Sequence, residues 1–216
     1  MNEELIARIR EEKLIAICRG VEASQCLRVA EALWEGGFRF VEITFDQRRP
    51  ESWQTTADAI AAVAGQFRGR MEAGAGTVVS VPLAELAAQA GARYIISPDV
   101  NPAVIRRTKE LGLISMPGAL TPTEAMTAVE AGADFVKLFP ISELGVGYVK
   151  ALRAPLSHID FMAVGGVNAE NLRAFLDAGC VGAGIGGCLV NRKWIEAGEF
   201  DKITRMAAEL VRIARG

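Results

Sequence analysis

The sequence predicts an α/β fold, a (β/α)8 barrel of the TIM type with a short N-terminal helix, and two patterns indicate it. Short β-branched runs alternate with longer alanine-rich stretches of helical period along the 216 residues, as in serial βα units. A step ending in glycine, such as Glu35-Gly36-Gly37 or Asp177-Ala178-Gly179, recurs before the predicted strands, where a left-handed helix C-cap favours glycine. Eight such units suit a closed barrel of small size.

Each element of the barrel has an expected range. Strands are predicted at residues 14–18, 39–45, 71–74, 94–97, 114–116, 135–139, 160–163 and 181–184. Helices are predicted at residues 23–35, 51–64, 82–90, 101–111, 123–131, 146–152, 169–178 and 201–214. No linker or charge block divides the chain, so a single domain over residues 1–216 is expected. An open doubly wound sheet is the alternative, but Cys18-Arg19-Gly20-Val21-Glu22 stands where its G-x-G-x-x-G motif would follow the first strand.

Composition indicates a cytoplasmic protein that binds small molecules. Half of the residues are hydrophobic, which is enough for a core without disulfides or metal. The four cysteines show no CxxC spacing, and residues 1–12 are charged, unlike a signal peptide. With a net charge of -2, no basic stripe and no apolar run near ~18 residues, neither nucleic acid nor a membrane is an expected partner.

Two charged side chains occupy strand positions that a barrel normally keeps apolar. Alternate residues of a strand face opposite sides. In the second predicted strand the outward set is wholly apolar, which leaves Glu42 facing the barrel interior; that outward set is Val41, Ile43 and Phe45. In the sixth strand Val136 and Leu138 match the helix layer, which leaves Lys137 inside.

Burying an ion costs several kcal/mol unless it is paired or neutralised, so these two positions need an explanation. One explanation is a structural ion pair between Glu42 and Lys137. The other is functional: desolvation between Phe135 and Phe139 lowers the pKa of the lysine, and a neutral amine attacks a ketone to form a Schiff base. A nearby carboxylate could then shuttle the proton, at the strand ends where barrel active sites gather.

Six motifs in order resemble one family across nearly the whole chain. They are Glu42-Ile43-Thr44, Gly74-Ala75-Gly76-Thr77-Val78, Ile96-Ser97-Pro98, Met116-Pro117-Gly118, Lys137-Leu138-Phe139-Pro140 and Gly165-Gly166-Val167. This series is similar to that of the KDPG/KHG aldolases, the class I 2-dehydro-3-deoxy-phosphogluconate and 4-hydroxy-2-oxoglutarate aldolases. Single motifs such as Gly-Gly-Val are weak signals, but six in register are a strong one.

The resemblance implies a carbon-carbon lyase that cleaves a 2-keto-3-deoxy or 4-hydroxy-2-keto acid to pyruvate and an aldehyde. It implies Lys137 as the Schiff-base lysine and Glu42 as the general acid/base, acting through a water. Thr77, Pro98 and Phe139 match positions that line the family's pyruvate pocket. No cofactor and no metal are implied, the partners are the keto acid and pyruvate, and the assembly implied is a homotrimer.

The chain departs from the family pattern at the position that binds the carboxylate of pyruvate. Many members place an arginine four residues after the glutamate, where this chain has Asp46. Arg19, at the end of the first strand, is a candidate to hold the pyruvate carboxylate with two hydrogen bonds. A rim arginine without that role is the alternative.

The phosphate site departs as well. Val164 stands where the family usually has threonine, and Gly187 stands where serine is common. Backbone amides and a following helix N-terminus can still cradle an anion, so the candidate residues here are Gly165, Gly166, Gly186 and Gly187. Tight turns explain these glycines equally well. The loss of two hydroxyl donors predicts a smaller advantage for a phosphorylated substrate and leaves room for 4-hydroxy-2-oxoglutarate.

Two other classes of function stay open on the sequence alone. One is a phosphate-binding barrel epimerase or isomerase, and the other is a non-catalytic ligand-binding barrel with a structural Glu42 to Lys137 pair. His158 is the only histidine, which argues against the epimerase and against a zinc-dependent aldolase, because both chemistries draw on imidazole.

Overall fold

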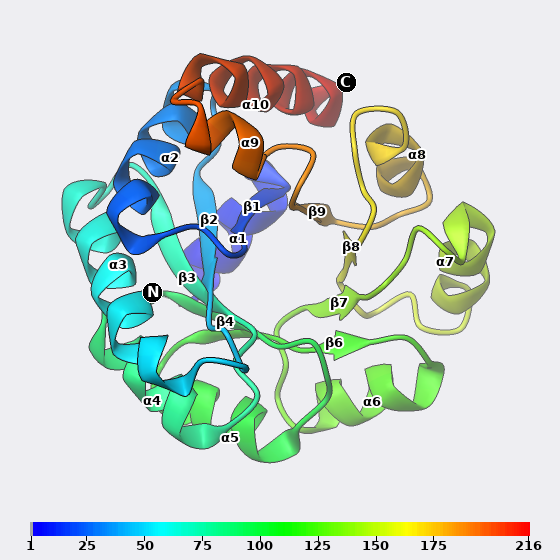
Figure 1. Cartoon of the computed structure of the whole chain (residues 1–216). Coiled ribbons are helices and arrows are strands. Elements are labelled where there is room, and N and C mark those ends of the chain that lie inside the picture. The colour runs from blue at the N-terminus through cyan, green and yellow to red at the C-terminus, as the bar shows by residue number, and fades with distance from the viewer. Residues whose placement is uncertain (1) are drawn as a thin grey trace.

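The computed structural model describes residues 2–216 and shows a ring of strands enclosed by helices (Figure 1). All strand pairs are parallel, and the order around the ring is β5-β4-β3-β2-β1-β9-β8-β7-β6. The strands are β1 Leu14–Cys18, β2 Phe40–Thr44, β3 Glu72–Gly76, β4 Tyr94–Ile96, β5 Ile114–Met116, β6 Gly118–Ala119, β7 Val136–Leu138, β8 Phe161–Val164 and β9 Gly182–Ile185.

The ring is closed, because β5 and β6 are two halves of one wall. Pro117, which has no N–H to donate, separates them, and β5 pairs with β4 while β6 pairs with β7. The Phe135 N–H donates to the Ser115 carbonyl at 3.3 Å, and the Lys137 N–H donates to the Pro117 carbonyl at 2.9 Å. The eight-walled barrel predicted from the sequence is therefore confirmed, with its fifth wall split.

In Figure 1 the helices surround the strands, except α1, which lies across one end of the barrel. Within residues 2–216 they are α1 Asn2–Glu12, the 3-10 turn η1 Pro50–Ser52, α2 Ala23–Glu35, α3 Trp53–Gln66, α4 Val81–Gln89, α5 Pro102–Glu110, α6 Pro122–Glu130, α7 Gly145–Arg153, α8 Leu172–Asp177, α9 Arg192–Glu196 and α10 Phe200–Arg215. The short N-terminal helix is present as predicted. Helix α9 was not predicted, because five residues are too few to show a helical period.

Several element ends differ from prediction for local reasons. Strand β3 runs from Glu72 to Gly76, where residues 71–74 were predicted, because its sequence Glu-Ala-Gly-Ala-Gly has little β propensity and gives no clear signal for its ends. Helix α8 begins at Leu172 and not at residue 169. The Asn168 side chain accepts hydrogen bonds from the Glu170 and Asn171 amides at 2.9 and 3.3 Å, which keeps the chain in a turn before the helix.

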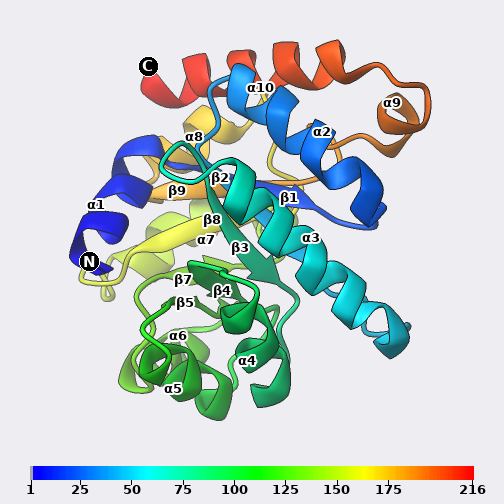
Figure 2. The ribbon, with the colours of Figure 1, turned by 90° about the vertical axis from the view of Figure 1, so that its left-hand side faces the viewer.

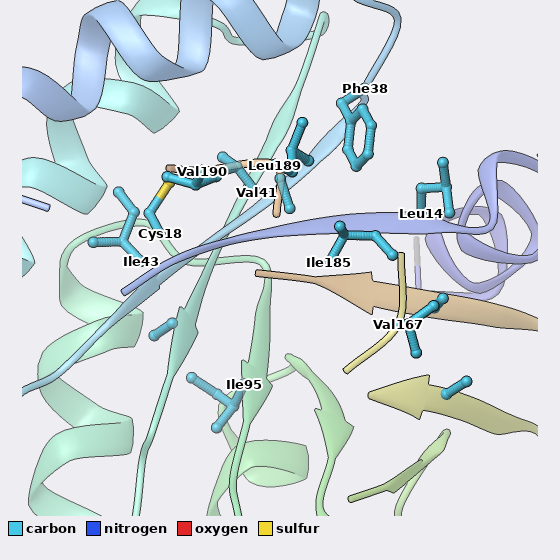
Figure 3. Close-up of a cluster of buried hydrophobic side chains, with 14 of the residues drawn as sticks. Leu14, Cys18, Phe38, Val41, Ile43, Ile95, Val167, Ile185, Leu189 and Val190 are labelled. Atoms are coloured by element: carbon cyan, nitrogen blue, oxygen red, sulfur yellow. The ribbon is translucent and has the colours of Figure 1, made fainter. Parts of the chain in front are cut away.

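The core has two separate layers, as the strand alternation predicted. The outer layer lies between strands and helices, and Figure 3 shows Val41 and Ile43 of β2 within it, near Leu189 and Val190. The inner layer fills the barrel; its members include Ile15, Ile17, Phe40, Tyr94, Ile96, Met116, Phe135, Met162 and Val164. The inner faces of the strands, where Glu42 and Lys137 were predicted to lie, therefore line a packed apolar interior.

Helix α1 covers one end of this interior, as Figure 2 shows. Leu5 and Ile9 pack into the inner layer. Arg8 donates to Glu72 at 2.8 Å, at the start of β3, and Arg10 pairs with Asp160 at 2.6 Å, just before β8. The end where the strands begin is therefore closed, which leaves the carboxyl ends of the strands for a site. No helix in the described part of the chain is both long and apolar enough to cross a membrane.

Candidate active site

Glu42 and Lys137 face each other across the barrel interior. Glu42 lies on β2 and Lys137 on β7, and three walls separate these strands whichever way the ring is followed. Glu42 is 0% exposed and Lys137 is 4% exposed. The inward orientation predicted for both residues is confirmed, and both side chains are removed from bulk water.

The two groups do not form a structural ion pair. Among residues 2–216, Glu42 and Lys137 make no N···O contact within 4.0 Å, and neither Glu42 oxygen has a hydrogen-bond partner. Burying an ion without a partner costs several kcal/mol, so the two buried groups destabilise the fold. Packing alone does not explain why they are present. Such an arrangement is typical of a functional site.

Burial moves both pKa values toward the neutral forms. Desolvation raises the pKa of the Glu42 carboxyl, while the positive charges of Lys137 and Arg19 oppose this rise. Desolvation also lowers the pKa of the Lys137 ammonium; Glu42 opposes this shift and Arg19 adds to it. Burial therefore favours a neutral amine on Lys137 and a protonated carboxyl on Glu42. These are the forms that attack a carbonyl and donate a proton.

Strand β3 makes room for the inner side chains by having glycine at its inward positions. A Cβ on Gly76 would lie 1.6 Å from Glu42 Oε1, and a Cβ on Gly74 would lie 2.1 Å from the ring of Tyr94. No side chain larger than hydrogen fits at either position without displacing a buried neighbour. The position of the Glu42 carboxylate therefore depends on Gly76.

Replacing Gly76 with alanine is expected to reduce any reaction that uses Glu42. A displacement of the carboxylate by about 1 Å corresponds to a loss on the order of 10²-fold in turnover. Gly65→Ala is the matched control, since a Cβ at this α3 glycine meets nothing within 4 Å and alanine favours a helix. Turnover and thermal unfolding of both variants check the expectation, and equal turnover of Gly76→Ala and Gly65→Ala would contradict it.

Thr77 and Arg19 meet at the open end of the barrel. Thr77 follows β3 with φ of 58°, a backbone conformation that a β-branched residue rarely adopts. The Gln47 amide donates to the Thr77 carbonyl at 2.8 Å, and Arg19 Nη1 donates to Thr77 Oγ1 at 3.4 Å. Arg19 is exposed, yet its charge acts on the pKa of both Glu42 and Lys137. Arg19 therefore places a positive charge at the open end of the barrel, where it influences Glu42 and Lys137.

Asp46, the residue at the family's usual arginine position, forms an ion pair with Arg49. Arg49 pairs with it at 2.9 Å, and the hydrogen bond from Arg49 is the largest cause of the lowered pKa of the Asp46 carboxyl. Arg19 and Asp46 both line a cavity of about 520 Å³ beside the barrel mouth. Because Arg49 already neutralises Asp46, the charge of Arg19 remains available to an anion.

Phe139 directly follows β7, the strand that holds Lys137, and Pro98 follows β4. The Phe139 ring centroid lies 4.7 Å from Lys137 Nζ, so the ring covers the amine. The Pro98 carbonyl oxygen would lie 2.5 Å from a Cβ on Gly118, which places the end of β4 directly against β6. The residues predicted for a pyruvate pocket, Thr77, Pro98 and Phe139, thus lie just beyond the carboxyl ends of β3, β4 and β7.

The four glycines predicted for an anion site do come together. Gly165, Gly166, Gly186 and Gly187 line one cavity of about 780 Å³, together with Arg19 and Phe139. Gly165 and Gly166 have φ of 93° and 76°, which glycine tolerates without strain. Helix α8 begins only at Leu172, so its N-terminus does not follow this loop directly, contrary to the prediction.

Sequence reasoning missed other residues of this cavity. Asn168, Asn191, Arg192 and Lys193 also line it. Arg192 and Lys193 belong to α9, the helix that was too short to predict. The signal available in the sequence was two adjacent cations shortly after the glycines of the eighth strand.

Comparison with known proteins agrees with the geometry. The family described as KDPG and KHG aldolase matches residues 5–206. The 2-dehydro-3-deoxy-6-phosphogalactonate aldolase of Escherichia coli strain K12 is 39% identical over 203 residues, which cover 91% of this chain and 96% of that protein. The KHG/KDPG aldolase of the same organism is 31% identical and covers 87% of this chain and 85% of its own length.

A solved structure described as native KDPGal is similar as well. It is 37% identical, covers 94% of both chains and superimposes with a TM-score of 0.84. The epimerase or isomerase and the non-catalytic barrel, the two alternatives that the sequence left open, are therefore wrong. The match over most of its length and the relatives above 30% identity show that this chain belongs to the KDPG and KHG aldolase family and is an aldolase, a carbon-carbon lyase.

Proposed function

We propose that this aldolase works through a Schiff base on Lys137 and releases pyruvate from a 2-keto-3-deoxy acid. The observation that carries the proposal is the unpaired Lys137 amine, buried opposite an equally unpaired Glu42. Burial lowers the pKa of the amine, and the neutral form is the nucleophile. A structural role would instead favour a close ion pair between the two groups.

The proposed reaction proceeds in three steps. Lys137 attacks the C2 ketone and water leaves, which forms a protonated imine that acts as an electron sink. Glu42 takes the proton of the C4 hydroxyl, the C3–C4 bond breaks, and its electron pair moves into an enamine while the aldehyde departs. Glu42 then returns the proton to C3, and hydrolysis of the imine frees pyruvate and Lys137.

The remaining site residues bind the two ends of the substrate. Arg19 binds the carboxylate next to C2, because its charge faces both Lys137 and Glu42 and a guanidinium grips a carboxylate with two hydrogen bonds. Thr77 and Pro98 border the pyruvate half, and the ring of Phe139 keeps water from the amine. The glycine-lined cavity receives the far end of the substrate.

The substrate that we propose first is 2-dehydro-3-deoxy-6-phosphogalactonate, because the relative at 39% identity carries that name over 91% of this chain. The second candidate is 4-hydroxy-2-oxoglutarate. The hydrocarbon side chain of Val164 and the missing side chain of Gly187 favour it, since both positions lack a hydroxyl donor for phosphate. A homotrimer and a cytoplasmic location stay predictions.

Trapping with pyruvate and borohydride tests the proposal. Borohydride reduces an imine to a stable amine, so we expect a reduced pyruvate adduct on the peptide that contains Lys137. Lys109 is an internal comparison, because it lies on α5 and pairs with Asp134 at 2.6 Å. Peptide mass spectrometry locates the adduct; saturating pyruvate that leaves Lys137 unmodified would rule out the Schiff base.

A further inference from the structure

The side chains that line the glycine-lined cavity carry a net positive charge. Arg19, Arg192 and Lys193 line it, and no aspartate or glutamate does. A Cβ on Gly20 would lie 3.7 Å from Arg192 Nη1, so the guanidinium of Arg192 reaches from α9 to the chain just after β1. In the part of the chain that the structure describes, Arg192 forms no ion pair within 4.0 Å, although Glu22 and Glu196 line a smaller pocket next to it.

The cavity beside the barrel mouth has a different character. Its lining includes Glu22 and Asp46 as well as arginines, so its charges are mixed. The glycine-lined cavity instead offers cations and amides such as Asn168 and Asn191, and no buried carboxylate to repel an anion. Its composition fits a group with more than one negative charge.

On the basis of the function proposed above, we propose that Arg192 binds the phosphate of a phosphorylated substrate. Arg192 thereby makes this aldolase specific for a phosphorylated 2-keto-3-deoxy acid. The planar guanidinium presents two parallel N–H donors to phosphate oxygens. It compensates for the hydroxyl donors that are absent at Val164 and Gly187. The glycines leave space for phosphate oxygens to approach the backbone.

The layout of the cavity supports this assignment. Phe139, which covers the Lys137 amine, lines the cavity together with Arg192, so both ends of one extended acid can be held at once. The volume of about 780 Å³ is in the range of small-molecule sites. Arg192 therefore discriminates between acids that differ at the end far from C2, and it takes no part in bond cleavage.

The test compares 2-dehydro-3-deoxy-6-phosphogalactonate with the same acid without phosphate. For Arg192→Met, which keeps much of the side-chain volume, we expect the ratio of kcat/KM for the two acids to fall by about 10-fold or more. The loss should appear as a higher KM for the phosphorylated acid, while kcat/KM for the unphosphorylated acid should not change. Arg106→Met is the matched control, because Arg106 is exposed on α5, away from this cavity. An unchanged ratio in Arg192→Met, or an equal loss for both acids, would overturn the assignment.

A binding measurement makes the test independent of catalysis. Inorganic phosphate is titrated into the wild type, Arg192→Met and Arg106→Met by calorimetry. We expect its Kd to rise about 10-fold only in Arg192→Met, and to rise with added salt in the wild type. If pyruvate leaves no adduct on Lys137 but phosphate binding still depends on Arg192, the proposed function fails and the anion site stands. If the adduct forms and phosphate binds all three proteins equally, the Arg192 assignment fails alone.

Discussion

Replacing Lys137 with methionine is expected to abolish cleavage and to leave the fold intact or more stable. Without the amine no imine forms, and turnover should fall by a factor on the order of 10⁴ or more. Methionine has a similar length and removes the cost of burying a cation, so the thermal midpoint should not fall. Pyruvate release and thermal unfolding are the two measurements.

The control for this variant is Lys150→Met. Lys150 is exposed on α7 and lines neither of the two cavities at the barrel mouth, so its loss should change neither measurement. A Lys137→Met protein that still cleaves substrate would require another nucleophile. A large fall in the thermal midpoint would show instead that Lys137 stabilises the barrel, as in the structural explanation.

Replacing Glu42 with glutamine is expected to separate imine formation from bond cleavage. Glutamine matches the shape of the buried side chain but cannot exchange a proton, so turnover should fall by about 10²- to 10⁴-fold. Lys137 keeps its place, and the pyruvate adduct should therefore still form. The measurement pairs steady-state turnover with borohydride trapping in the same protein.

The pH dependence of trapping gives Glu42→Gln a second, signed outcome. The Glu42 charge raises the pKa of Lys137 against the larger effect of burial. Removing that charge lowers the pKa further below 10.5, so more neutral amine exists at low pH. The acid limb of the trapping profile should move to lower pH.

Glu209→Gln, an exposed change on α10, should move neither turnover nor the trapping profile. A shift of the Glu42→Gln profile to higher pH would mean that the two groups do not interact as proposed. Retained turnover in Glu42→Gln would remove Glu42 from the proton transfers altogether.

The barrel and its two inner charges were predictable because both depend on local repetition. Alternation along residues 40–45 assigns Glu42 to the inner face, and the same parity assigns Lys137, whatever the distance between the strands. The less regular parts were harder to predict. Strand β3, with the sequence Glu-Ala-Gly-Ala-Gly, lacks a strand-like composition, and α9 is shorter than the window in which a helical period appears.

The sequence by itself determined the fold class, the faces of the strands and the order of the family motifs, because each follows from residue spacing along the chain. Only the tertiary structure decided that Glu42 and Lys137 stand on opposite walls without an ion pair, and that Gly76 makes the space for Glu42. It also decided that Arg192 reaches Gly20, 172 positions earlier in the chain (192 − 20). Closure of the ring brings together segments that are far apart in the sequence, and no local sequence pattern indicates which of them meet.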